Sequence, residues 1–366
     1  MVTQQQDHQR GVPLIQGRRG THGRTQPPPS ARRPNRGPEA TMLAFAVRRL
    51  LVSIPVFIVS TFLVFLLVTW GADPLAQLKA KNPPPSQAVI NALANQLYIN
   101  HSLPARYGHW FSQLFFHGNW GPSVQSGTDI GQLLSTSLVL TARLVILAML
   151  LAVVLAIVSG VISATRQYSK TDYTITLIGF LFLSLPVFWF AILLKQLVVN
   201  MNNSLNWYWI STYGANTPGL TGWSAFSDAL GHLILPTIVL AMSSYASWSR
   251  FQRSSMLDVL GSDYMRLARA KGLSRMRVMV RHGLRTALIP LTTQVALDTA
   301  AVLGGAVLTE NVFGWQGMGT MLVNGINAGD FNTILAWLTV SAIIVILFNL
   351  IADLLYGVLD PRIRNA

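Results

Sequence analysis

The residues of this chain that could do chemistry are few and widely spaced. The sequence contains neither a Gly-x-x-x-x-Gly-Lys-Ser/Thr phosphate-binding loop nor a His-Glu-x-x-His zinc motif. His101, His109 and His117 recur every eight residues, which favours surface histidines on an amphipathic loop over a metal site. The chain has no cysteine, so disulfides, thiolate metal sites and cysteine nucleophiles are excluded. We therefore expect no catalytic residue, no metal site and no enzymatic activity.

A glycine-rich segment is the next candidate. Gly314, Gly317 and Gly319 have spacing reminiscent of a dinucleotide-binding fingerprint, but no strand precedes them. The segment is better interpreted as a tight re-entrant or extracellular turn.

The composition of the chain predicts the secondary structure that must position these residues. Of the 366 residues, 51% are hydrophobic and only 11% are charged, whereas a soluble domain carries about 25% charged residues. A run of about 20 apolar residues suffices to cross a bilayer. The sequence therefore predicts an all-α polytopic membrane protein with six transmembrane helices. The predicted spans are residues 50–70, 144–163, 174–197, 231–248, 286–308 and 333–355, and we expect Pro186 and Pro236 to kink their helices.

The charges predict the orientation of these spans. The net charge is +14, and basic residues gather before the first span, in the loop after the second and in residues 250–285. The alternate loops, 71–136 and 309–331, are nearly neutral or acidic. The positive-inside rule then places both termini in the cytoplasm. This rule accounts for the basic charge, so we expect contact with membrane lipid and no binding of nucleic acid.

Two further segments lie outside the spans. Residues 1–41 are rich in arginine, proline and glutamine, and we expect them to form a disordered basic tail. Residues 42–366 are then the transmembrane domain. The loop of residues 71–136 is rich in aromatic residues. We predict that it is ordered, with helices near 87–98 and 104–116.

The basic segment 256–290 is the sharpest feature of the sequence. Apolar residues from Met265 to Leu273 alternate with basic ones, and Gly272 indicates a helix end. A second short helix is expected at 278–280. An interfacial helix held by anionic lipid headgroups and a helix offered to the groove of a cytosolic partner both fit this composition.

Seven segments spread along residues 42–366 carry a resemblance to a known family. They are ARAKGLS (268–274), RHGLRTALIP (281–290), MLAFAVRRLL (42–51), GADP (71–74), NWGPS (119–123), LTENVFGWQGMG (308–319) and NLIADLLYGVLDPRIR (349–364). Together they resemble binding-protein-dependent ABC transporter permeases, specifically the B-type subunit of the dipeptide/oligopeptide/nickel group. The chain departs from this family at Asn119, where the family usually has Asp, at Gln316, where it commonly has Pro, and in the tail of residues 1–41, which has no counterpart.

The resemblance implies a type I ABC importer permease in a prokaryotic cell membrane, moving peptides by alternating access. Implied partners are a second homologous permease subunit, two ATP-binding subunits and an extracytoplasmic solute-binding protein. ATP and Mg²⁺ would bind to the ATPase subunits and not to this chain. The implied coupling residues, within the coupling loop 250–285, are Arg266, Ala268, Arg269, Ala270, Lys271, Gly272, Leu273 and Ser274. The external turn would include Glu310, Phe313, Gly317 and Gly319.

Ionisable residues within the spans are functional candidates. Asp298, beside Gln294, either lines the pathway and meets a peptide amino terminus or makes a buried structural hydrogen bond. Arg143 and Lys195 are expected to snorkel to the interface, and Asp353 and Asp360 to pair with arginines.

Two other classes remain open from the residues. A self-sufficient channel or ion-coupled carrier would be favoured by discontinuous helices, but the apolar runs here are mostly continuous. A membrane scaffold could use the basic loop and tail to bind anionic lipid. Within the transporter class, the substrate could also be a nickel chelate or another small solute.

Overall fold

The computed structural model describes residues 38–71, 75–80, 83–123 and 127–359. Throughout these ranges the regular elements are helices, and an isolated antiparallel bridge joins Pro122 to Asp129. Most of the tail predicted at residues 1–41, and Asp360, lie outside the described residues. The helices are α1 (Pro38–Gly71), α2 (Ala76–Lys79), α3 (Gln87–Gln96), α4 (Leu103–His117), α5 (Ile130–Thr165), α6 (Lys170–Ser184), α7 (Val187–Leu205), α8 (Gly222–Leu260), α9 (Asp263–Ala270), α10 (Arg275–Arg277), the π-helix η1 (Val278–Leu284), α11 (Arg285–Leu297), α12 (Thr299–Phe313), α13 (Met318–Asn327) and α14 (Phe331–Leu359).

The predicted spans correspond to long helices or bent helix pairs. Among the described residues, α1, α5, α8 and α14 are each long and apolar enough to cross a membrane, and the pairs α6–α7 and α11–α12 qualify if each bent pair is one span. The resulting count of up to six agrees with the prediction. The second span starts earlier than predicted, because α5 begins at Ile130, so Arg143 is exposed within the helix and not at its start.

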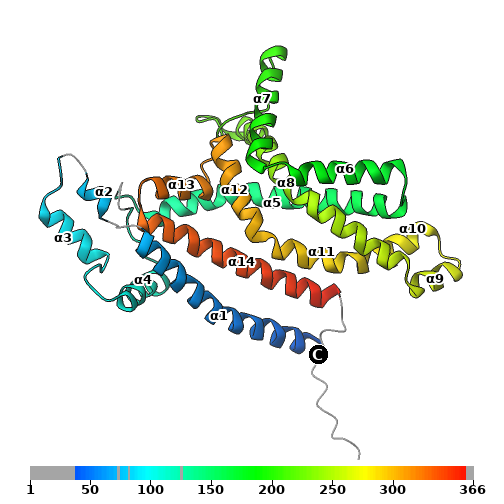
Figure 1. Ribbon diagram of the computed structural model, residues 1–366, viewed down its shortest axis with the longest axis horizontal. Coiled ribbons are helices and arrows are strands. Elements are labelled where there is room, and N and C mark those ends of the chain that lie inside the picture. The colour runs from blue at the N-terminus through cyan, green and yellow to red at the C-terminus, as the bar shows by residue number, and fades with distance from the viewer. Residues whose placement is uncertain (1–37, 72–74, 81–82, 124–126, 360–366) are drawn as a thin grey trace, which may run out of the picture.

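The third and fifth spans are less continuous than the apolar runs suggest. α6 and α7 meet at an angle of 105°, and α7 rises away from the other helices (Figure 1). Pro186 explains the break, because proline disfavours helical geometry in the residue before it, and Leu185 is extended with ψ 125°. Pro236, in contrast, lies within an uninterrupted α8. α11 and α12 are bent by 53° at Asp298.

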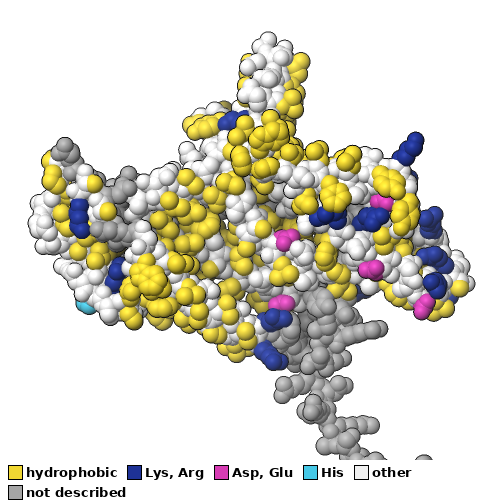
Figure 2. Space-filling model, in the orientation of Figure 1, with side chains coloured by type: hydrophobic (Ala, Val, Ile, Leu, Met, Phe, Trp, Pro, Cys, Tyr) yellow, Lys and Arg dark blue, Asp and Glu magenta, His cyan; other side chains and the backbone are white. Residues whose placement is uncertain are grey.

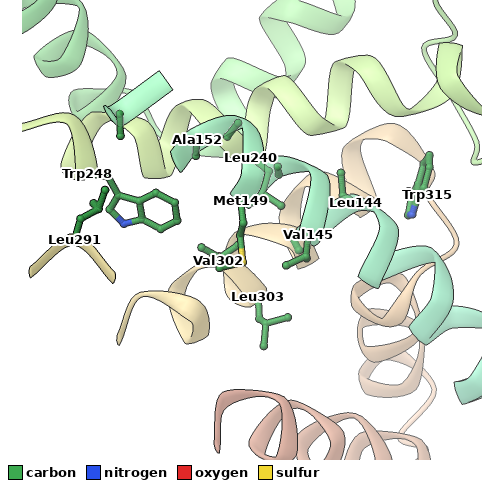
Figure 3. Packing of buried hydrophobic residues seen from close by; sticks show 14 of the residues in the cluster. Leu144, Val145, Met149, Ala152, Leu240, Trp248, Leu291, Val302, Leu303 and Trp315 are labelled. Atoms are coloured by element: carbon green, nitrogen blue, oxygen red, sulfur yellow. The ribbon is translucent and has the colours of Figure 1, made fainter. Parts of the chain in front are cut away.

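The core forms where α5 and α8 pack together with α11 and α12 (Figure 3). α5 presents Ala148, Ala152, Ala156 and Gly160 at intervals of four residues, and all four are buried. Small residues at this spacing let helix backbones approach closely in membrane proteins. A Cβ added at Gly160 would lie 2.8 Å from the Cβ of Gln252 on α8. This seam fixes the distance between the two longest helices.

Two groups of short helices lie at opposite ends of this core (Figure 1). α9 and α10 are at one end, called the α9 end below. α2, α3, α4 and α13 are at the other, called the α13 end. Phe65 of α1 packs with Phe331 and Leu335 of α14, and Tyr107 and Trp110 of α4 cover this cluster. The two helices predicted within residues 71–136 are thus confirmed as α3 and α4.

Candidate functional site

The predicted coupling segment is a short helix followed by a sharp turn. α9 begins after Ser262 and its last helical residue is Ala270. Gly272 has φ +75°, a backbone conformation that residues with a Cβ rarely adopt, so glycine here lets the chain reverse toward α10. The predicted helix end at Gly272 is confirmed.

One face of α9 belongs to the core. Met265 is 1% exposed and Val278 of η1 is 2% exposed, and both pack in a cluster with Met256 of α8 and Ala164 of α5. A Cβ added at Gly283 would lie 3.1 Å from the Met265 methyl carbon. The segment is therefore seated against the ends of the two longest helices.

The opposite face of α9 is exposed, apolar and basic. Tyr264 and Leu267 are 43% and 58% exposed, and Met276 of α10 is 65% exposed. The apolar stripe predicted from Met265 to Leu273 is therefore split between two faces, because a helix turns by about 100° per residue. We call the exposed set the α9 face. It comprises Tyr264, Arg266, Leu267, Ala270, Lys271, Arg275, Met276 and Arg277.

The other predicted coupling residues lie beside this face. Arg269 is exposed, and its Nη2 donates a hydrogen bond to the carbonyl oxygen of Leu260 at 3.1 Å. Ala268 and Leu273 are partly buried, whereas Ser274 is exposed and precedes α10. Basic side chains gather over this end of the molecule (Figure 2). The arrangement suits docking of an apolar partner surface with an acidic rim.

At the α13 end, Glu310 organises the predicted turn. Its carboxyl group is completely buried and accepts hydrogen bonds from Thr141 Oγ1 at 2.5 Å and from the backbone N–H groups of Gly319 and Thr320 at 2.6 and 3.2 Å. Thr141 Oγ1 also accepts from the N–H of Met318 at 2.7 Å. One carboxyl group thus joins α5, α12 and α13.

The glycines of the turn allow α13 to come close enough to Glu310 for these hydrogen bonds. A Cβ added at Gly319 would lie 2.5 Å from Val307 Cα and 2.8 Å from Glu310 Oε2, so only glycine lets α13 approach α12 here. Gly317 lies against the same carboxyl group. Phe313 is also buried but packs in a different cluster, with Val239 of α8 and Ala191 of α7. The structure therefore brings together three of the four predicted turn residues.

Asp298 lies at the bend between α11 and α12 and has partners within the protein. Its Oδ2 accepts a hydrogen bond from Trp248 Nε1 at 2.7 Å, and Gln294 Nε2 donates to both carboxylate oxygens at 3.0 and 3.1 Å. The partner on the neighbouring helix α8 is therefore the indole N–H of Trp248.

The remaining predicted charges have distinct partners. Lys195 Nζ donates to the carbonyl oxygen of Val312 at 2.7 Å, so its ammonium group meets the end of α12. Arg49 Nε lies 3.2 Å from Asp353 Oδ2, which confirms the predicted pairing of Asp353.

Two histidines of the loop 71–136 stack on an aromatic ring. His101 and His109 both stack on Tyr98, with ring centroids 4.1 and 4.0 Å from the Tyr98 ring. No metal-binding group of three His, Cys, Asp or Glu side chains occurs among the described residues.

Sequence analysis missed a buried ion pair at the α9 end. Asp172 of α6 is 3% exposed, and Arg253 of α8 contacts both of its oxygens, at 2.9 and 2.8 Å. Ser163 of α5 donates to the same carboxylate, and so does the N–H of Tyr168 at 2.9 Å. The available signal was the Ser169-x-x-Asp172 pattern typical of a helix start, whereas Arg253 was one of several basic residues in the segment 250–285.

Apolar helices long enough to cross a bilayer define a polytopic membrane protein. Residues 153–365 match the model of the binding-protein-dependent transport system inner membrane component. The chain belongs to this family.

Individual relatives match over nearly their whole length. The chain is 38% identical over 328 residues to the oligopeptide transport system permease protein OppB of Mycobacterium tuberculosis, covering 88% of this chain and 99% of that protein. It is 35% identical over 344 residues to the dipeptide transport system permease protein DppB of Escherichia coli, again covering 88% and 99%. Among solved structures, an inward-facing MetNI methionine ABC transporter chain aligns with TM-score 0.48 and 17% identity, over 63% of this chain and 97% of that one.

Proposed function

We propose that this chain is the permease subunit of an ATP-driven importer that moves peptides across the cell membrane by alternating access. The family supports the permease role, and relatives named as oligopeptide and dipeptide permeases support the substrate class. In this proposal two partner subunits bind ATP and Mg²⁺, a second homologous permease completes the pathway, and an extracytoplasmic binding protein delivers the substrate.

The two-sided α9 segment carries the coupling part of the proposal. Its outer face offers Tyr264 and Leu267 to an ATPase groove, while Met265 is held in the core. Movement of the docked ATPase would therefore be transmitted through Met265 to the ends of α5 and α8. Alternating access requires a bias between two states, and the ATPase supplies it. This assignment makes the α9 end and both termini cytoplasmic and the α13 end external.

Leu267→Asp tests the docking surface. Leu267 is 58% exposed, so a charge there leaves the fold intact but opposes burial in an apolar groove. We expect the wild-type chain to co-purify from mild detergent with an ATPase and a second permease, and the variant to lose the ATPase. Val89→Asp on α3, at 51% exposure, is the matched control at the other end and should retain it. A wild-type homo-oligomer without any ATPase would contradict the proposal and favour a channel or carrier.

Uptake assays test the substrate and the pathway. Cells lacking the chain should lose uptake of labelled di- or oligopeptides, and restoring it should restore uptake. Restoration of nickel uptake without peptide uptake would replace the peptide assignment. Asp298→Asn, assayed at equal abundance, should reduce uptake if this carboxylate lines the pathway. Normal uptake would leave Asp298 only its hydrogen bonds to Trp248 and Gln294.

A further inference from the structure

A cavity of about 330 Å³ lies at the α13 end, between α4 and the first turn of α14. Its walls combine aromatic rings and side-chain amides around one cation. The aromatic walls include Phe65, Tyr98, Trp110 and Trp120. Such a cavity, mostly apolar with a few polar groups, is typical of small-ligand sites.

The cation is Arg106 of α4, and it is 9% exposed. Its Nε atom is buried and has no hydrogen-bond partner. Arg106 makes no ion pair with any described residue, and its guanidinium carbon lies 5.9 Å from the centroid of the Phe65 ring. Burial lowers the pKa of Arg106 from its ordinary value, although a guanidinium group stays charged in proteins.

A buried cation without a counter-charge is costly, since ions lose their hydration on burial. None of the residues that line the cavity carries a carboxylate to offset this cost: besides Arg106, the polar lining residues are amides, His109 and Tyr98. Asn119 shows how these amides are held: its Oδ1 accepts from the N–H of Gly121 at 2.9 Å and its Nδ2 donates to Gln113 at 3.4 Å. These amides are hydrogen-bonded to one another and to the backbone, and they carry no charge that could neutralise Arg106.

We propose that this cavity binds a carboxylate carried next to an apolar or aromatic side chain. Arg106 would supply the planar pair of N–H donors that fits a carboxylate, and Trp110 and Trp120 would pack on the neighbouring side chain. Two sources share this chemistry: the free carboxyl terminus of a small peptide, and an acidic side chain of a docking protein. The binding itself does not require the transport role, whereas the external location of the cavity rests on the proposed function.

Fluorescence titration tests the site directly, because Trp110 and Trp120 line the cavity. The full-length chain, in lipid nanodiscs with the subunits that co-purify with it, is titrated with three probes. These are glycyl-phenylalanine, its C-terminal amide, and N-acetyl-phenylalanyl-aspartate with an amidated carboxyl terminus. We expect one carboxylate probe to bind at least about tenfold more tightly than the amide. Preference for glycyl-phenylalanine identifies a peptide terminus, and preference for the aspartate probe identifies an acidic side chain.

Variants then assign the binding to Arg106. Arg106→Gln should abolish the preference for carboxylate, while Arg166→Gln, at an exposed arginine of the other end, should preserve it. Asn119→Asp should weaken carboxylate binding, because it adds a competing negative charge to the same cavity. Equal affinity of the wild-type chain for acid and amide probes, or no binding of either acid, would overturn the inference. That result would leave the permease role intact, since ATPase co-purification and uptake are measured separately.

Discussion

The two ends of the molecule handle buried charge differently. At the α9 end, Asp172 and Arg253 face each other as a matched pair. At the α13 end, Glu310 is buried among hydroxyl and backbone N–H donors, and Arg106 is buried among aromatic rings and amides, each without an opposite charge among the described residues. The two charges of the pair neutralise each other within the protein, so no external ligand is needed to compensate them. Unmatched groups leave the other end dependent on backbone geometry and, in our proposal, on an incoming ligand.

Asp172→Asn should have the largest effect on stability. The change keeps the shape but leaves Arg253 without its partner, and breaking a buried pair in this way costs about 3 kcal/mol. Unfolding in mixed detergent micelles, followed by tryptophan fluorescence, measures the loss. Replacing both residues with leucine should cost less than the two single leucine changes added together. Strict additivity would show that the pair is not coupled.

Gly319→Ala should come next. The added methyl group would meet the backbone of Val307 on α12, so α13 must shift, at a cost of about 2 kcal/mol. Gly304→Ala, also on α12, is the control, because no atom lies within 4 Å of the added carbon. The same unfolding assay should find the control unchanged or slightly more stable. Equal losses in both variants would show that contact with Val307 is not the cause, since helix propensity alone favours alanine over glycine.

Glu310→Gln should cost less than Asp172→Asn, about 1 kcal/mol. Its amide oxygen can still accept from Gly319 and Thr320, and no cation is left unpaired. The same unfolding assay on Asp172→Asn and Glu310→Gln compares the loss of unfolding free energy at the two ends. A loss at Glu310 as large as that at Asp172 would contradict the difference between the two ends.

Asp263→Asn should have the smallest effect, below about 0.5 kcal/mol. Asp263 and Arg266 form an ion pair at 3.5 Å with both side chains largely exposed, and such pairs contribute little. Unfolding at low and high salt checks this, and a salt-dependent loss above 1 kcal/mol would contradict it. The variant also serves as the exposed counterpart of Asp172→Asn.

Features set by composition were predictable from the sequence. The apolar runs, the helices of the external loop and the helix end at Gly272 all follow from local patterns. Helix breaks were predictable only in part. A proline within an apolar run predicts a kink, and the chain does bend at Pro186, whereas α8 continues through Pro236 and the bend at Asp298 has no proline to predict it. The expectation of mostly continuous spans was therefore wrong at two places, and helix continuity is no argument against a carrier.

The site was predictable in part. Glu310, Gly317 and Gly319 could be grouped because they are close in the sequence. Thr141, which completes their hydrogen bonds, lies on α5 and is separated from Glu310 by 169 positions. The partners Asp172 and Arg253 are 81 positions apart. No local pattern specifies such pairs, since they depend on which helices pack together. Arg106 entered the sequence analysis only within the charge balance of its loop, because burial cannot be read from a single arginine.

The unbroken α8 has a mechanical consequence. Its 39 residues form a strut of about 58 Å, reaching from the end that carries α9 toward the opposite end. The close seam with α5 runs beside this helix, whereas the neighbouring spans are bent at Pro186 and at Asp298. A lever of this length that tilts by about 5° displaces its far tip by about 5 Å. A small tilt of α8 at one end of the molecule therefore displaces its other end by several ångströms, because the helix is continuous between them.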